Sequence, residues 1–159
     1  MEDQSIDSNK LQKFVTKMRE NIMEEITQQI SGDVLVNRVN LLRATINEAA
    51  DLRTLLDEQI TIGHSKIVID LSQCTHLDST FVGVLVVTQK KLLAKGGELK
   101  MVDPLDPAKE LLYLIGISKV FETFEIAEEA VKSFNNRIKI SKPKSGSEIP
   151  EKEMKWAFA

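Results

Sequence analysis

Apolar residues recur at intervals of three and four near the start of the chain. This spacing puts them on one face of a helix that begins near Lys10. The members of the stripe are Leu11, Phe14, Val15, Met18, Ile22, Ile26 and Ile30. Its second half has two interpretations, because residues 26–39 also have the pattern of two strands joined by a turn at Ser31-Gly32-Asp33. We predict a helix to about Asn21 and a β-hairpin after it.

Two helices and an intervening strand are predicted in the middle of the chain. From Thr45 onward a helical stripe runs until Gly63, and its members are Ile46, Ala49, Leu52 and Leu56. Residues 66–71 form a short β-branched run, which is typical of a strand buried on both faces of a parallel sheet. Residues 79–95 lack proline, follow the N-cap residue Asp78 and precede Gly96-Gly97, so we predict a long buried helix there.

Strands and helices continue to alternate in the last third of the sequence. Strands are predicted at residues 98–103 and 120–124. Helices are predicted at residues 108–115, after Asp106-Pro107, and at residues 126–135. Strands that alternate with helices at this short spacing indicate an α/β fold in which the helices pack against a sheet.

The chain divides into three predicted parts. Residues 1–21 are a helical N-terminal extension, residues 22–137 are a single folded domain, and residues 138–159 are a flexible C-terminal tail with little to bury. Two lone aromatic residues, Trp156 and Phe158, end the tail. They fit either a frayed terminus or a docking motif.

The composition of the chain argues against several classes of function. With 42% hydrophobic residues, the chain can form a core without disulfide or metal support. Its net charge of −3 offers no basic cluster for nucleic acid or anionic lipid. The longest apolar run, Phe81 to Val87, is too short to span a bilayer, and the single cysteine, Cys74, fits a reducing compartment. We therefore expect a cytoplasmic protein with no direct nucleic-acid contact and no membrane insertion.

Residues suited to catalysis are few. No glycine-rich turn followed by a lysine is present to hold a phosphate. Cys74 and His76 share one short loop with no further ligand nearby, so we predict no metal site. His76, Asp78 and Ser79 are the residue types of a hydrolase triad, but near neighbours on one turn diverge and cannot form the proton relay. We expect no enzymatic activity and no cofactor.

The segment Asp78-Ser79-Thr80 has two interpretations. These residue types satisfy the free N–H groups at a helix start, which is a purely structural role. The alternative is a phosphorylated switch. A phosphate at this position would be tolerated by the helix dipole and would form an acidic patch together with Asp78. Such a change would alter what docks on the surface without refolding the domain.

Several segments together resemble a STAS domain of the anti-sigma factor antagonist type. They are Ile67–Ser72, the loop Gln73–Leu77, Asp78–Leu85, Lys95–Leu99, Leu111-Leu112 and Gly116-Ile117. The resemblance covers roughly Ile26 to Phe134. It implies a single α/β domain with a mixed, mostly parallel β-sheet of about five strands packed with about four helices, to which the N-terminal helix is added.

The resemblance also implies regulation of transcription by partner switching. The unphosphorylated antagonist binds an anti-sigma factor serine/threonine kinase with a histidine-kinase-like ATPase fold, and phosphorylation of the antagonist releases it. Ser79 matches the acceptor position, Thr80 is a second hydroxyl beside it, and a serine phosphatase would restore the active form. The residues then expected to bind the partner are Asp78, Ser79, Thr80, Phe81, Val82, Arg43 and Thr45.

Two positions differ from the usual family pattern. Phe81 stands where the family often has glycine, and we expect it to enlarge the apolar contact beside Ser79. Residues 41–45 replace an acidic loop that commonly touches the kinase, and Arg43 and Ala44 suggest either a partner with different charge requirements or a divergent subgroup.

A second hypothesis is a constitutive adaptor. STAS-like domains also serve as subunits of lipid-transport or stress-sensing complexes, where Ser79 would be only a cap. The amphipathic stripe before Ile22 would favour this role if it mediates assembly, although packing on its own sheet is the commoner fate of such a stripe. The sequence leaves a homodimer open.

Overall fold

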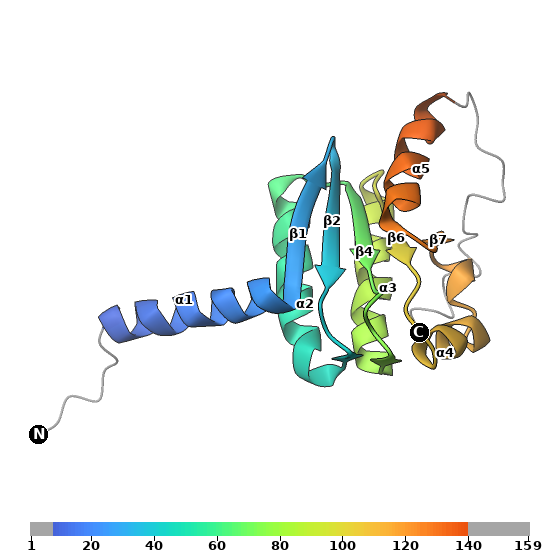
Figure 1. Ribbon diagram of the computed structural model, residues 1–159. Helices are drawn as coiled ribbons and strands as arrows, with labels where there is room; N and C mark the ends of the chain where they lie inside the picture. The colour runs from blue at the N-terminus through green and yellow to red at the C-terminus, as the bar shows by residue number, and fades with distance from the viewer. Residues whose placement is uncertain (1–7, 140–159) are drawn as a thin grey trace, which may run out of the picture.

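A five-stranded sheet with the order β1-β2-β4-β6-β7 forms the centre of the molecule (Figure 1). The computed structural model describes residues 8–139. The strands are β1 (Ile26–Ser31), β2 (Val34–Val39), β4 (Lys66–Asp70), β6 (Glu98–Val102) and β7 (Thr123–Phe124). β1 and β2 form an antiparallel hairpin, whereas the remaining neighbours are parallel. The predicted mixed, mostly parallel sheet is therefore confirmed.

Helices cover both faces of this sheet. The α-helices are α1 (Ser8–Glu25), α2 (Ile46–Ile62), α3 (Ser79–Ala94), α4 (Ala108–Leu114) and α5 (Ala127–Lys139), and a short 3-10 helix, η1, spans Ile117–Lys119. In Figure 1, α2 and α3 lie behind the sheet, α5 lies in front of it, and α1 projects away from the rest. The described residues thus contain four helices packed around the sheet and the predicted N-terminal helix.

Two apolar clusters follow from the alternation of side chains along the strands. Ile67, Ile69 and Leu71 face α2 and α3 in the main core, whereas Val68 faces α5 in a smaller cluster with Phe134. Buried polar side chains are paired: the amides of Asn37 and Gln59 exchange two hydrogen bonds of 2.8 Å between β2 and α2. This pairing fixes the position of α2 on the sheet, because a buried amide left without a partner is costly.

Gln89 is a second buried amide, and it connects three elements. Its Oε1 accepts a hydrogen bond of 2.7 Å from the backbone N–H of Leu99 in β6. Its Nε2 donates to the carbonyl of Val120 at 3.2 Å. The middle of α3 is therefore held to the sheet and to the segment after η1.

Three predicted boundaries were wrong. The last helix, predicted at residues 126–135, extends to Lys139. The N-terminal helix continues to Glu25 rather than ending at Asn21, because no helix breaker lies between them and the strand starts only where Ile26 pairs with Val39. The strand predicted at residues 120–124 is limited to Thr123–Phe124. Val120 and Phe121 are both buried in the main core, which a regular strand with alternating side chains would not allow.

Two other predictions concern the ends of the chain and the membrane. Of the tail predicted at residues 138–159, residues 138–139 belong to the end of α5, and residues 140–159, including Trp156 and Phe158, lie outside the described residues. Among residues 8–139, no helix combines the length and apolar character needed to cross a bilayer.

Candidate functional site

A pair of two-residue strands joins the loops that precede α2 and α3. β3 (Arg43–Ala44) pairs in parallel with β5 (His76–Leu77). The carbonyl of Leu42 accepts hydrogen bonds from the backbone N–H groups of Thr75 at 2.8 Å and His76 at 3.0 Å. This small sheet was not predicted, because two-residue strands have no periodicity. It brings the predicted site residues of both loops to one end of the molecule.

Asp78 connects the starts of the two helices. Its Oδ1 accepts a hydrogen bond of 2.9 Å from the backbone N–H of Phe81, which caps α3 as predicted. Its Oδ2 accepts a hydrogen bond of 2.6 Å from the backbone N–H of Ile46, the first residue of α2. One carboxylate therefore satisfies N–H groups of two helices and fixes the surface between them.

Thr45 begins α2 with a capping box. Its side-chain oxygen accepts from the backbone N–H of Asn47 at 3.3 Å, and its own backbone N–H donates to Glu48 Oε1 at 3.0 Å. The threonine is half-buried, whereas the neighbouring Arg43 is exposed. Of these two predicted partner-binding residues, Arg43 is thus the one available for contact through its side chain.

Ser79 and Thr80 occupy the first turn of α3, and both are exposed. The first residues of a helix have N–H groups without intrahelical acceptors, and the helix dipole is positive there. A negative charge added to either hydroxyl would therefore lie in a favourable field.

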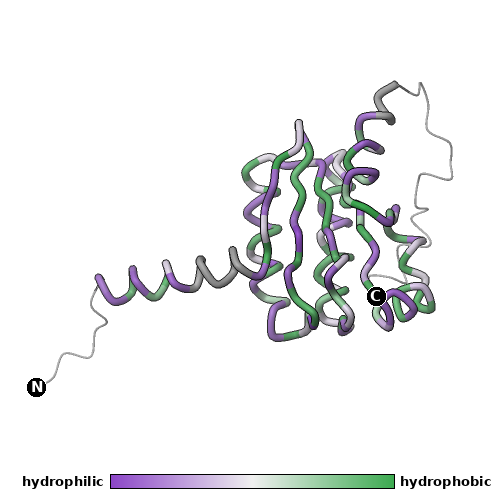
Figure 2. Tube along the Cα trace, viewed as in Figure 1, coloured by the Kyte–Doolittle hydropathy of each residue, from purple (hydrophilic) through white to green (hydrophobic). Residues whose placement is uncertain are grey.

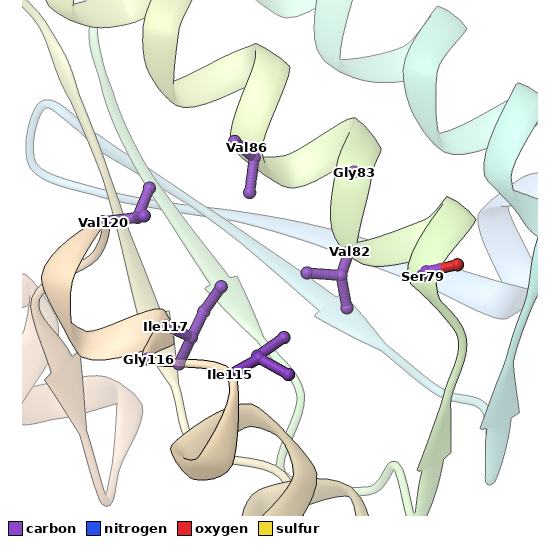
Figure 3. Close-up of a pocket in the computed structure, with 8 residues that line it drawn as sticks. All are labelled: Ser79, Val82, Gly83, Val86, Ile115, Gly116, Ile117 and Val120. Carbon is purple, nitrogen blue, oxygen red and sulfur yellow. The ribbon is translucent and has the colours of Figure 1, made fainter. Parts of the chain in front are cut away.

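An apolar groove lies beside Ser79, between α3 and the segment that connects α4 to η1 (Figure 3). Its volume is about 180 Å³. The lining residues are Ser79, Val82, Gly83, Val86, Ile115, Gly116, Ile117 and Val120. Figure 3 shows Ser79 at the edge of the groove with its hydroxyl directed away from the apolar side chains. The hydroxyl is thus open to a modifying enzyme while the groove is open to an apolar ligand.

A second hollow, of about 270 Å³, lies on the other side of α3, toward α2. Its polar lining residues are Arg53, Thr80, Thr88 and Lys91. Lys91 Nζ pairs with Asp57 Oδ1 at 2.9 Å. The two hydroxyls therefore differ in surroundings, because Ser79 borders an apolar groove and Thr80 borders a hollow with two cations.

Gly83 lines both hollows and separates them. A Cβ added at this glycine would meet no atom within 4 Å. Gly97 is the opposite case, because a Cβ there would collide with the backbone carbonyl of Ser65. The fold thus requires a glycine at position 97 but not at position 83, where glycine costs about 1 kcal/mol of helix stability relative to alanine.

The structure changes the roles expected for Phe81 and Val82. Phe81 is 0% exposed and Val82 is 6% exposed, so Phe81 packs into the main core and does not enlarge an exposed contact beside Ser79. Apolar residues that the sequence did not single out are exposed around the site instead: Leu42 (68%), Ile46 (63%) and Ile115 (44%). Ile46 belongs to the apolar stripe that predicts α2, but the structure places it on the exposed side of the helix.

The remaining candidates for chemistry do not form a catalytic site. Cys74 is fully buried, and desolvation, with a smaller effect of the Asp70 charge, raises the pKa of its thiol to about 12. Within residues 8–139 no group of three metal-ligating side chains gathers. His76 Nδ1 lies 2.9 Å from Thr75 Oγ1, while the Asp78 carboxylate binds backbone N–H groups. His76, Asp78 and Ser79 are therefore not linked as a triad.

Comparison with known proteins identifies the family. The STAS domain model matches residues 14–130, which is well over half of the chain, and the chain therefore belongs to the STAS domain family. Proteins of this family generally have no enzymatic activity. The match begins within α1 and ends within α5, so it includes the whole sheet and both hollows beside α3.

Individual relatives give the same fold. A Thermotoga maritima protein classed as a candidate anti-sigma factor antagonist is 25% identical over 109 residues, which are 69% of this chain and 96% of that protein. The crystal structure of a candidate anti-sigma factor antagonist from the same organism is 23% identical with a TM-score of 0.65, covering 72% of this chain and 98% of its own. Unphosphorylated SpoIIAA, an anti-sigma factor antagonist of Bacillus, is 16% identical with a TM-score of 0.61, covering 70% of this chain and 96% of its own.

Not every similar structure is an antagonist. A sulfate transporter family protein from Wolinella succinogenes is 16% identical with a TM-score of 0.59, covering 70% of this chain and 93% of its own. The expected STAS fold is confirmed by all these structures. Because one fold carries both kinds of protein, function has to be inferred from the surface around Ser79.

Proposed function

We propose that this protein is an anti-sigma factor antagonist that works by partner switching. When unphosphorylated it binds an anti-sigma factor that is a serine/threonine kinase, and so releases a sigma factor in the cytoplasm. Phosphorylation of Ser79 by that kinase ends the binding, and a serine phosphatase restores it. The exposed Ser79 hydroxyl at the start of α3, at the edge of an apolar groove, is the observation that carries this proposal.

A phosphate on Ser79 needs no change of fold. It would carry between one and a half and two negative charges at neutral pH, next to the N–H groups of the first turn of α3. The cap of the helix is provided by Asp78, whose carboxylate is already held by Ile46 and Phe81. The modification therefore changes the charge of the surface while both helix starts stay in place.

The same phosphate would weaken binding at the groove. A partner that fills the groove among Val82, Ile115 and Ile117 and also covers the start of α3 would remove water from the phosphate. Removing water from a charge without pairing it is costly. A phosphate on Thr80 would instead lie on the side of α3 that faces Arg53, whose positive charge would offset part of the charge of the phosphate. We therefore assign the switch to Ser79 rather than to Thr80.

Gly83 supports close approach of a partner to α3. The fold has space for a side chain at this position, yet the sequence retains the residue that destabilises a helix. Because glycine has no side chain, a partner can lie across α3 at this position and contact both hollows within one turn of the helix. The docking surface of the proposal consists of Ser79, Gly83, Ile115 and Ile46, with Arg43 at its margin.

Affinity capture with Ser79 variants tests the proposal. Purified Ser79→Ala and Ser79→Asp proteins are immobilised side by side and exposed to a lysate of the organism that makes this protein, and bound proteins are identified by mass spectrometry. We expect the alanine protein to retain a histidine-kinase-like ATPase and the aspartate protein to lose it. Thr80→Ala and Thr80→Asp serve as matched controls, and both are expected to retain the ATPase.

Two results would contradict the proposal. The first is an identical set of captured proteins for the Ser79 variants. The second is a purified kinase of this type that binds the chain and, with ATP, places no phosphate on Ser79 by peptide mass spectrometry.

A second candidate function is a constitutive adaptor subunit, such as one in a lipid-transport or stress-sensing complex. The observation that favours it is the exposure of Leu11, Phe14 and Val15 on α1. This helix projects away from the sheet (Figure 1). In this case partners would bind through α1, and neither Ser79→Asp nor phosphorylation would change their binding. Removal of residues 1–21 would abolish their capture, whereas in the partner-switching proposal it leaves the ATPase bound.

A further inference from the structure

Two arginines on the α2 side of the candidate site have no charged partner. Arg43 in β3 and Arg53 in α2 are both exposed. Neither guanidinium makes an ion pair or a hydrogen bond with any residue that the structure describes. The cross-strand neighbour of Arg43 is His76, which is exposed and is no anion. A guanidinium binds a carboxylate through two parallel hydrogen bonds, so each arginine is free to take an acidic group.

The carboxylates of this region are occupied or point elsewhere. Both oxygens of Asp78 accept backbone N–H groups at the starts of α2 and α3. Asp57 pairs with Lys91 at 2.9 Å. At 3.6 residues per turn, the remaining acidic residues of α2 lie at least about 140° around the helix from Arg53. They are Glu48, Asp51 and Glu58. The fold therefore leaves the charge of both arginines uncompensated.

Exposed apolar side chains accompany the two arginines. Leu42 precedes Arg43 directly, and Ile46 is seven residues before Arg53, which places both on the same side of α2. Leu42 and Ile46 are exposed, and so is Val87, which lines the same hollow as Arg53. Figure 2 shows hydrophobic and hydrophilic positions interspersed along α2. This side of the docking surface thus combines apolar contact area with two unpaired cations.

A partner that binds the proposed docking surface has to cover Arg53. Gly83 lines both hollows, and Arg53 lines the second of them. A partner that lies across α3 at Gly83 and also contacts Ile46 removes water from the guanidinium. Removing water from an unpaired charge is costly, whereas a carboxylate placed against it supplies a charge-assisted hydrogen bond. A partner that fits this surface therefore carries acidic groups where it meets α2.

We propose that the anti-sigma kinase presents an acidic patch to the α2 side of the surface. Its carboxylates pair with Arg43 and Arg53, and its apolar side chains cover Leu42 and Ile46. This inference rests on the proposed function and specifies the chemistry of the partner. The net charge of the chain, −3, would by itself favour a basic partner. The two arginines thus select among kinases, because one with basic residues at this place is repelled.

Binding kinetics at low and high salt test the inference. The purified ATPase that Ser79→Ala captures is the probe, and a biosensor carries the chain. Arg43→Gln/Arg53→Gln should weaken binding roughly tenfold or more at low salt, and less at high salt, because salt screens the attraction that the wild type retains. Arg43→Lys/Arg53→Lys keeps the charge and should retain most of the affinity.

A matched pair of variants controls for net charge. Lys95→Gln/Lys132→Gln removes the same two charges from exposed positions at the far end of α3 and on α5. The helix α5 lies on the opposite face of the sheet from α2 and α3 (Figure 1). We expect this variant to bind the ATPase as the wild type does. Circular dichroism and thermal unfolding confirm that all variants are folded.

Charge exchange identifies the groups of the partner. Lysine is substituted for single acidic residues of the ATPase. A substitution in the acidic patch should weaken binding to the wild type and restore part of the binding to Arg43→Glu/Arg53→Glu, because the two charges are exchanged. A loss of binding in Arg43→Glu/Arg53→Glu that no such substitution restores would contradict the inference.

The inference and the proposed function can fail separately. If ATP releases the ATPase from the wild type, but Arg43→Gln/Arg53→Gln binds with wild-type affinity and salt dependence, the acidic patch is wrong and partner switching stands. If the ATPase binds phosphorylated and unphosphorylated wild type equally, partner switching is wrong, and the arginine variants still decide on the acidic patch. If no ATPase binds the wild type at all, both are wrong.

Discussion

Asp78 lies 2.6 Å from the backbone nitrogen of Ile46, at the start of a helix 32 residues earlier in the sequence. The same carboxylate accepts the N–H of Phe81 at 2.9 Å. The beginnings of α2 and α3 are thus held by one side chain, and the exposed residues Ile46 and Ser79 lie on either side of it. A partner that contacts both helices meets a surface fixed by a single residue.

Replacing Asp78 should therefore destabilise the protein more than the loss of a single helix cap would. Asp78→Ala removes the acceptor of two helix-terminal N–H groups, and we expect a loss of about 1–3 kcal/mol in the free energy of unfolding. Urea denaturation measures it. Asp78→Asn retains one side-chain acceptor and should cost less. Glu58→Ala, at an exposed position of α2, is the control, and an equal effect of Asp78→Ala and Glu58→Ala would contradict the bridging role.

Substitutions at Gly83 should affect the free energy of unfolding and the binding of the kinase separately. Gly83→Ala should raise the free energy of unfolding by up to about 1 kcal/mol, because alanine is the better helix former and its Cβ meets no atom. Gly83→Leu should keep the domain folded and weaken binding of the kinase, measured by titration calorimetry. Ala94→Leu places the same side chain at the exposed far end of α3 and should leave binding unchanged. Tight binding by Gly83→Leu would show that no partner approaches α3 there.

The apolar groove should tolerate charge in the free protein but not in the complex. Ile115 is 44% exposed, so Ile115→Glu should change the free energy of unfolding by less than about 1 kcal/mol. It should weaken kinase binding roughly tenfold or more, because the added carboxylate lies where the partner removes water. Ile126→Glu, at a residue 50% exposed before α5, is the matched control. Equal affinities of the two variants would place the docking surface elsewhere.

Cys74 should be unreactive in the folded protein. With its pKa raised to about 12 by burial, only about one thiol in ten thousand is ionised at pH 8. A thiol reagent such as Ellman's reagent should therefore react slowly with native protein and rapidly in urea. Because the folded state holds this proton more tightly, Cys74 reduces stability only as the pH rises above its ordinary pKa of 9.0. Fast reaction of the native protein at pH 8 would contradict the burial.

The sequence allowed most of the fold to be predicted, because its long elements have clear periodicity and punctuation. Lys66–Asp70 is a β-branched run, and α3 lies between Asp78 and Gly96. The predictions failed where local signals are weak. Nothing in Val120-Phe121 reveals that both side chains enter the core beside η1, and the helix-forming residues 22–25 extend α1 up to the point at which pairing with β2 begins.

The sequence singled out the residues at the centre of the candidate site but not those at its edges. Asp78 and Ser79 follow from capping rules and from the resemblance, since both concern neighbouring residues. Ile46 and Ile115 come from other parts of the sequence and reach Ser79 only through the β3–β5 pairing and the α4–η1 turn. Phe81 was expected to enlarge the apolar contact beside Ser79, but the first turn of α3 directs it into the core.

The central claim is that a phosphate on Ser79 ends partner binding, and ATP-driven release tests it most directly. The wild-type chain and Ser79→Ala are immobilised on a biosensor, the purified anti-sigma kinase is bound to both, and ATP with magnesium is added. We predict that the kinase leaves the wild type, with Ser79 phosphorylated, and stays on Ser79→Ala. Equal release from both proteins, or retention on a phosphorylated wild type, would contradict the claim.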